Sequence, residues 1–119
     1  IGRVVLNLIN NAFYALDENK KQQPGGYEPT VSLSTKNING KVEISVKDNG
    51  NGIPQKVLDK IFQPFFTTKP QGLGLGLGLA ISEQITRQFG GVLRAENAPG
   101  GGAIFTIELQ IATQEEKHV

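Results

Sequence analysis

Residues 62–82 read Phe-Gln-Pro-Phe-Phe-Thr-Thr-Lys-Pro-Gln-Gly-Leu-Gly-Leu-Gly-Leu-Gly-Leu-Ala-Ile-Ser. Glycine alternates with leucine in the second half, at Gly72, Gly74, Gly76 and Gly78. Glycine lets a backbone approach an anion closely or adopt positive φ. The residues that follow favour a helix, whose N-terminal amides and dipole attract negative charge. The stretch therefore predicts a mobile loop that closes over a phosphate chain and runs directly into a helix.

Composition limits what the rest of the chain can be. A chain of 119 residues with 38% hydrophobic content is long enough for one folded domain and too short for two ordinary ones. The net charge of +1 gives no general attraction to nucleic acid or to an anionic membrane, so anion binding must be local. The lack of cysteine excludes disulfides and thiolate metal sites. No apolar run approaches the roughly 20 residues of a membrane span. Separately, we expect the chain to be a fragment of a longer protein or an engineered chain.

Hydrophobic periodicity and turn residues predict the order of elements. Apolar residues at helical spacing predict a first helix over about 1–18, with Phe13 on its buried face. Asn39-Gly40 predicts a hairpin between strands 30–36 and 41–48. The remaining expected elements are a short helix at 54–62, a helix at 78–89 that stops at Gly90-Gly91, strands at 92–96 and 103–111, and a polar tail at 112–119. This order favours an α/β two-layer sandwich.

Asp48-Asn-Gly-Asn-Gly52 closes the second strand of the hairpin. A carboxylate there can accept a hydrogen bond from an exocyclic amine, while Gly50 and Gly52 let a flat ring lie against the backbone. Charge-assisted acceptance of this kind is strong and directional, which suits recognition of adenine. An Asp-Asn-Gly turn without a ligand is the alternative, because such clusters often mark turns.

Three further side chains are candidates for the phosphate side. Asn7 and Asn11 lie four residues apart and so share one helix face. An amide oxygen suits Mg²⁺ when phosphates supply other oxygens. The alternative, which the two residues alone favour, is that both are ordinary helix-surface asparagines, as we take Asn10 to be. Lys69 is the sole cation of residues 62–82 and could meet a terminal phosphate or remain a solvated loop lysine. Phe62 is expected in the core.

Five motifs occur in one order along nearly the whole chain, over about residues 1–111. They are Asn7-x₃-Asn11-Ala12, Asp48-x-Gly50-x-Gly52, Phe62-x-Pro64-Phe65, Gly74-x-Gly76-Leu77-Gly78-Leu79 and Gly100-Gly101-Gly102-Ala103-x-Phe105. This series resembles the N, G1, F, G2 and G3 boxes of the ATP-binding catalytic domain of sensor histidine kinases, in the GHKL superfamily shared with gyrase, Hsp90 and MutL. The Pro-Phe-Phe-Thr-Thr-Lys-Pro segment is most similar to nitrogen-regulation and C4-dicarboxylate sensor kinases.

The resemblance implies a fold and a set of site residues. The fold is the Bergerat-type ATP-binding fold, a mixed, mostly antiparallel sheet covered on one face by about three helices, here without the family's first strand. The implied ligands are ATP and Mg²⁺. Asn11 matches the Mg²⁺-binding asparagine, with Asn7 as its phosphate-side or metal-side companion, and Asp48 matches the adenine-reading aspartate. The remaining implied contacts are Gly50 and Gly52 at the adenine pocket, and Lys69, Gly74, Gly76 and Gly78 at the phosphates.

The chain departs from the family pattern at several places. Tyr14 stands where many relatives carry a basic residue, and Ala103 where many carry threonine. The segment with the phosphorylated histidine is not among these residues, and His118 has no such context. The ATPase branches place a glutamate four residues before the metal asparagine, but Asn7 occupies that position and cannot act as a base near neutral pH.

The resemblance thus implies a protein histidine kinase catalytic domain, residues 1–111. It would donate the γ-phosphoryl group of ATP to a histidine on a separate dimerisation domain and act indirectly on a response regulator. We expect a cytoplasmic monomer without direct contact to nucleic acid or membrane, in a parent kinase that can be membrane-anchored; pairing through an open strand edge is the alternative to a monomer. A nucleotide-binding module without phosphotransfer and a dinucleotide-dependent oxidoreductase are the other functional hypotheses; the latter requires a parallel βαβ unit.

Overall fold

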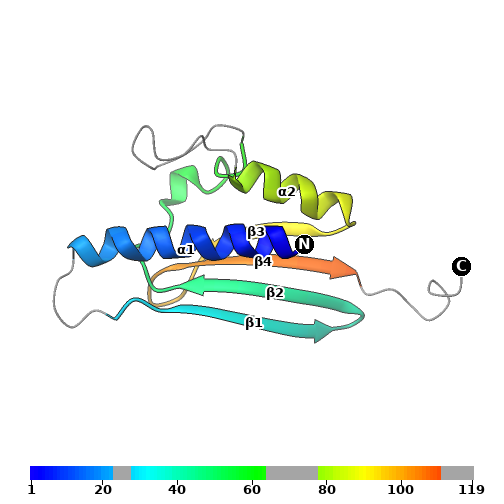
Figure 1. The fold of residues 1–119 in the computed structure, drawn as a ribbon, viewed down its shortest axis with the longest axis horizontal. Helices are drawn as coiled ribbons and strands as arrows, with labels where there is room; N and C mark the ends of the chain where they lie inside the picture. The colour runs from blue at the N-terminus through cyan, green and yellow to red at the C-terminus, as the bar shows by residue number, and fades with distance from the viewer. Residues whose placement is uncertain (23–27, 64–77, 111–119) are drawn as a thin grey trace, which may run out of the picture.

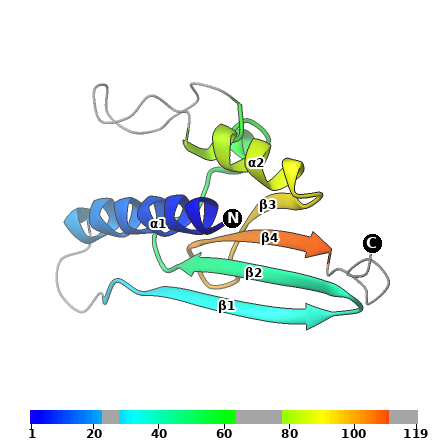
Figure 2. The ribbon, with the colours of Figure 1, turned by 45° about the vertical axis from the view of Figure 1, so that its right-hand side comes forward.

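The computed structural model describes residues 1–22, 28–63 and 78–110, with side chains described outside 17–22 and Gly78. Its elements follow the order α1 (Gly2–Gln22), β1 (Val31–Ile38), β2 (Lys41–Asp48), η1 (Gln55–Val57), α2 (Gly78–Gln88), β3 (Val92–Asn97) and β4 (Ala103–Gln110). The helices α1 and α2 lie on the same face of the sheet (Figures 1 and 2). The expected α/β two-layer sandwich is confirmed.

The sheet has the strand order β1-β2-β4-β3. Both hairpins, β1–β2 and β3–β4, are antiparallel, and so is the central pairing of β2 with β4. Within the described residues the sheet is therefore antiparallel throughout rather than mixed. The parallel βαβ unit that a dinucleotide-dependent oxidoreductase would require is not found in the described strands, which argues against that alternative.

Glycines form the turn of the first hairpin and follow the end of α2, as their sequence positions predict. Asn39 has φ of 50° and Gly40 has φ of 79°, the left-handed pair that a two-residue hairpin turn needs. At the end of α2 the Gly91 amide donates to the Thr86 carbonyl at 2.9 Å, and Gly90 has φ of 76°. Both turns place the following strands where they can pair.

One apolar stripe of α1 lies on the sheet. Val4, Leu8, Ala12 and Leu16 recur every fourth residue and are at most 5% exposed. The first three of them pack in a core with residues of β2, β3 and β4, namely Val46, Leu93, Ala103, Phe105 and Ile107. Burying a leucine or valine contributes about 2 kcal/mol, so this stripe holds α1 firmly in place.

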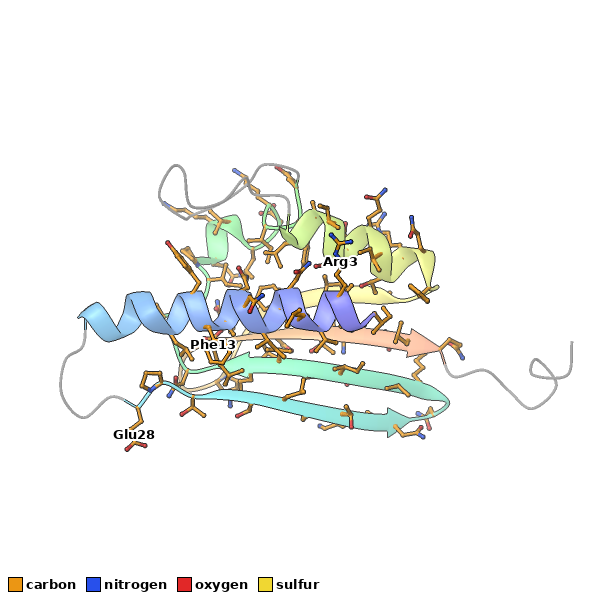
Figure 3. The ribbon with its side chains drawn as sticks, viewed as in Figure 1. Arg3, Phe13 and Glu28 are labelled. Atoms are coloured by element: carbon orange, nitrogen blue, oxygen red, sulfur yellow. The ribbon has the colours of Figure 1, made fainter. Side chains whose placement is uncertain are left out.

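Two expectations about the elements are wrong. Phe13, expected on the buried face of the first helix, is 58% exposed, since its position lies off the stripe of fourth residues. Figure 3 shows its side chain beneath α1, on the side of β1 and β2. The short helix expected at 54–62 is a 3₁₀ turn at Gln55–Val57 followed by turns, whose backbone bonds each span three residues, such as Lys60 to Val57 at 2.9 Å.

Candidate functional site

Asp48 is the last residue of β2 and is only 4% exposed. Its Oδ1 accepts hydrogen bonds from the amide of Gly50 at 2.8 Å and from the amide of Ala103, the first residue of β4, at 3.3 Å. Two backbone donors from separate segments thus fix the carboxylate plane. Neither bond uses Oδ2, which leaves that oxygen able to accept from the amine of a ligand.

Two glycines make room for the backbone around Asp48. A side-chain carbon built on Gly50 would lie 3.1 Å from Asp48 Oδ1 and 3.4 Å from the carbonyl oxygen of Ala15 in α1. Gly102 has φ of 89°, and a side-chain carbon there would overlap the carbonyl of Asp48. The end of β2 therefore lies directly between α1 and the glycine turn before β4.

Asn97, at the end of β3, holds the loop that follows Asp48. Its Oδ1 accepts from the Ile53 amide at 2.6 Å and its Nδ2 donates to the Ile53 carbonyl at 2.7 Å. Gly52 has φ of 79°, and a side-chain carbon there would lie 2.7 Å from Asn97 Oδ1. We did not predict this contact; Asn97 precedes an Ala-Pro-Gly turn in the sequence, and nothing in that pattern indicates its partner.

Asn49 makes the same kind of contact on the other side of Asp48. Its Oδ1 accepts from the Thr30 amide at 2.9 Å, and its Nδ2 donates to the Glu28 carbonyl at 2.9 Å. Glu28 lies just before β1 (Figure 3). Sequence reasoning assigned Asn49 only to a turn, whereas the structure makes it a clamp on the start of β1.

A line of residues one turn apart on α1 connects α2 with the loop between β2 and η1, residues 49–54, which we call the Asp48 loop. Asn7 donates from Nδ2 to Ser82 Oγ of α2 at 3.3 Å. Asn11 follows one turn later, and Ala15, whose backbone carbonyl lies next to Gly50, one turn after that. Figure 3 shows Arg3, one turn before Asn7, on the side of α1 that is nearer α2 in that view. The structure thus brings Asn7, Asn11 and the Asp48 loop to one side of α1.

Several predicted site residues cannot be placed. Lys69, Gly74 and Gly76 lie outside the described residues, as do Phe65 and the rest of 64–77. Gly78 is the first residue of α2, as the predicted loop-to-helix junction requires. Phe62 is half-buried and meets Phe105 edge to face, with ring centroids 6.5 Å apart, so its expected core position is confirmed.

The donor set fits a magnesium ion that phosphates help to bind. Within residues 1–22, 28–63 and 78–110 there is no cluster of three or more His, Cys, Asp or Glu side chains that could hold a metal. Mg²⁺ often uses one or two protein oxygens and takes the others from water and phosphate. The amide oxygens of Asn7 and Asn11 suit that role.

None of the described helices is both long and apolar enough to cross a membrane.

Comparison with known proteins defines the class of protein. Residues 1–113 match the family of histidine kinase-, DNA gyrase B- and HSP90-like ATPases. The two-component sensor PprA of Pseudomonas aeruginosa is 43% identical over 98% of this chain and 12% of its own length. The sensor histidine kinase ZraS of Klebsiella oxytoca is 38% identical over 98% of this chain and 23% of its own length. The chain thus spans less than a quarter of these relatives.

Solved structures that resemble this chain also come from histidine kinases. The catalytic domain of histidine kinase ThkA has a TM-score of 0.72 and 35% identity over 90% of this chain and 63% of its own. Full-length ShkA in complex with AMPPNP has a TM-score of 0.76 and 30% identity over 93% of this chain and 21% of its own. The chain belongs to the histidine kinase-, DNA gyrase B- and HSP90-like ATPase family, as its five motifs predict. Its solved neighbours include a histidine kinase catalytic domain, so the chain is a domain of the histidine kinase type. The finer likeness to nitrogen-regulation and C4-dicarboxylate kinases stays a prediction.

Proposed function

We propose that this domain binds ATP with Mg²⁺ and donates the γ-phosphoryl group to a histidine on a separate dimerisation and phosphoacceptor domain. The observation that carries the proposal is the line along α1, in which Asn7 contacts α2, Asn11 follows, and the backbone carbonyl of Ala15 lies next to Gly50 of the Asp48 loop. This line connects an acidic strand end, suited to a purine amine, with the helix that follows a glycine-rich sequence. A purine triphosphate has its base and its phosphates at opposite ends and matches that arrangement.

Asp48 would recognise the adenine. Its Oδ1 is already used by two backbone amides, so its Oδ2 would accept from the exocyclic amine. Gly50 and Gly52 would shape the pocket, because the space next to each is taken by neighbouring atoms, Asp48 Oδ1 for Gly50 and Asn97 Oδ1 for Gly52. A larger residue at either position would displace the loop on which the base is proposed to lie.

Asn11 would ligate Mg²⁺ through its amide oxygen, and Asn7 would contact the metal or a phosphate beside it. When bound, Mg²⁺ would neutralise charge on the β- and γ-phosphates. The residues of this chain would bind and orient the nucleotide, while the amides at the start of α2 would face its negative charge. Lys69, Gly74, Gly76 and Gly78 are proposed as further phosphate contacts from the sequence alone.

The absence of a base at Asn7 favours phosphotransfer over hydrolysis. An amide cannot remove a proton from water near neutral pH, so water would be a poor nucleophile toward the γ-phosphoryl group. An imidazole needs no such base to attack. We therefore propose slow hydrolysis by the domain alone, transfer to a histidine domain of the parent kinase, an indirect effect on a response regulator, and a cytoplasmic location.

Calorimetric titration with a non-hydrolysable ATP analogue, with and without Mg²⁺, tests nucleotide binding. Asn11→Ala should abolish the part of the affinity that depends on Mg²⁺. Asn10→Ala is the matched control, because Asn10 is adjacent on α1 and exposed, and its affinity should stay unchanged. Binding that Asn11→Ala leaves intact would contradict the assignment.

A nucleotide-binding module without transfer is the alternative. Labelled ATP, the domain and a separately added histidine domain distinguish the two. Label on the histidine domain, removed by Asp48→Ala, supports phosphotransfer. Tight nucleotide binding without any transfer supports the module.

A further inference from the structure

Ser82 connects the two helices at the proposed nucleotide site. It lies on α2 four residues after Gly78 and is fully buried, with 0% exposure. Its Oγ accepts a hydrogen bond from Asn7 Nδ2 at 3.3 Å, across 75 positions of sequence. Ser82 is therefore a buried hydroxyl whose partner is a side chain proposed to contact the ligand.

The bond holds the Asn7 side chain against α2. The terminal torsion of asparagine is broad, so the amide would rotate more freely without this partner. Because Nδ2 is engaged by Ser82, Oδ1 is directed elsewhere. An oxygen suits a cation or a donor, whereas an amide nitrogen suits a phosphate oxygen.

A neighbouring hydroxyl shows what a purely structural role looks like. Thr86 is equally buried, one turn later on α2, and its Oγ1 donates to the Ser82 carbonyl at 2.8 Å. That bond stays within one helix and holds the backbone of Ser82 in place. The Ser82 hydroxyl instead extends to another helix, so its effect reaches the α1 side chain.

We propose that Ser82 is a positioning residue of the nucleotide site, whose hydroxyl holds the Asn7 side chain in place for the ligand. This inference rests on the proposed nucleotide binding. Ser82 would act through Asn7 and would not touch the nucleotide itself. Removing the hydroxyl should weaken nucleotide binding only as long as Asn7 is present.

A double-mutant cycle tests this coupling. The four proteins are the unchanged chain, Asn7→Ala, Ser82→Ala and the double variant, each titrated with a non-hydrolysable ATP analogue and Mg²⁺. One hydrogen bond of this kind corresponds to about a three- to tenfold loss of affinity for Ser82→Ala. In the Asn7→Ala background the same change should alter affinity by less than about twofold.

Controls separate positioning from packing. Ser82→Cys keeps the volume but supplies only a weak acceptor, so it should repeat the loss if Ser82→Ala fails to fold. Thr106→Val removes a buried hydroxyl that contacts Ser45 Oγ at 3.2 Å and should leave affinity unchanged. An equal loss in both Asn7 backgrounds, or none in either, overturns the inference. If the unchanged chain binds no nucleotide, the proposed function fails as well.

Discussion

The side-chain amide of Asn97 forms two hydrogen bonds with the backbone of Ile53, at 2.6 Å to its amide and 2.7 Å to its carbonyl. The side chain at the end of β3 thus bonds both the donor and the acceptor of one loop residue, as the backbone of a neighbouring strand would. Asn49 does the same with Thr30 and Glu28, on the opposite side of Asp48. The acidic strand end is thus held by two amide clamps whose partners are backbone atoms.

Asn97→Ala should weaken this loop. It leaves the amide and the carbonyl of Ile53 without their partner, and because Asn97 is exposed, water replaces part of what is lost. We expect a loss of about 1 kcal/mol in the free energy of unfolding, measured with urea. The displaced loop should also lower nucleotide affinity, measured by calorimetry.

The control for Asn97 is Asn37→Ala on the exposed strand β1. It removes an amide of the same size away from the Asp48 loop, and both stability and affinity should stay near those of the unchanged chain. Equal effects of the two substitutions would show that the clamp has no special role.

Gly102→Ala should be far more damaging than Gly100→Ala. Both glycines have positive φ, 89° and 85°, so an L-residue is strained at either place by about 1 kcal/mol. A side-chain carbon at Gly100 has no atom within 4 Å, but at Gly102 it would overlap the carbonyl of Asp48. We expect a total loss of about 3 kcal/mol for Gly102→Ala, by urea unfolding. Similar losses at both positions would refute the close packing on Asp48.

Local sequence signals predicted the elements that depend on local physics. Asn39-Gly40 and Gly90-Gly91 supply the positive φ that their turns need, and alternation of apolar residues located the strands. The first helix is longer than expected and ends at Gln22 rather than near residue 18. The added residues include good helix formers, and the helix-breaking residues Pro24 and Gly25 come only after them.

Contacts that depend on the assembled fold could not be predicted. The partner of Asn97 is the backbone of a residue 44 positions away, and a backbone group carries no sequence signal. The bond of Asn7 to Ser82 spans 75 positions and needs both helices in place. The motif order predicts Asp48 and Asn11 as site residues, but the contacts of Asn49 and Asn97 around Asp48 depend on the strand order β1-β2-β4-β3.

Asp48→Asn should separate ligand recognition from folding. Asparagine keeps an oxygen for the amides of Gly50 and Ala103, and places a donor where the proposed adenine amine needs an acceptor. We expect unfolding free energy within about 1 kcal/mol of the unchanged chain, and nucleotide affinity lowered by about tenfold or more.

Asp48→Ala is the contrasting variant. It leaves both backbone amides without their acceptor and should cost about 2 kcal/mol in unfolding free energy. Asp48→Asn that binds ATP as well as the unchanged chain would count against adenine recognition by this residue.

Three charged side chains interact on the face of the sheet opposite α1 and α2. Glu43 of β2 and Glu108 of β4 stand directly opposite each other, and Arg94 of β3 contacts them at 3.1 and 3.5 Å. Arg94→Gln removes the cation between two like charges and should lower the unfolding free energy by about 0.5–1 kcal/mol at low salt. The difference should shrink in high salt, where exposed charges are screened.

Lys41→Gln is the matched control for Arg94→Gln, since Lys41 contacts only Glu108 of this pair, at 3.5 Å, and its effect should be smaller. Nucleotide affinity should not change in either variant, because these side chains project from the face of the sheet opposite α1 and α2. Urea unfolding at two salt concentrations, with calorimetric titration of the ATP analogue, checks both expectations. A stability loss that is independent of salt would show that Arg94 acts by packing over Thr106 rather than by its charge.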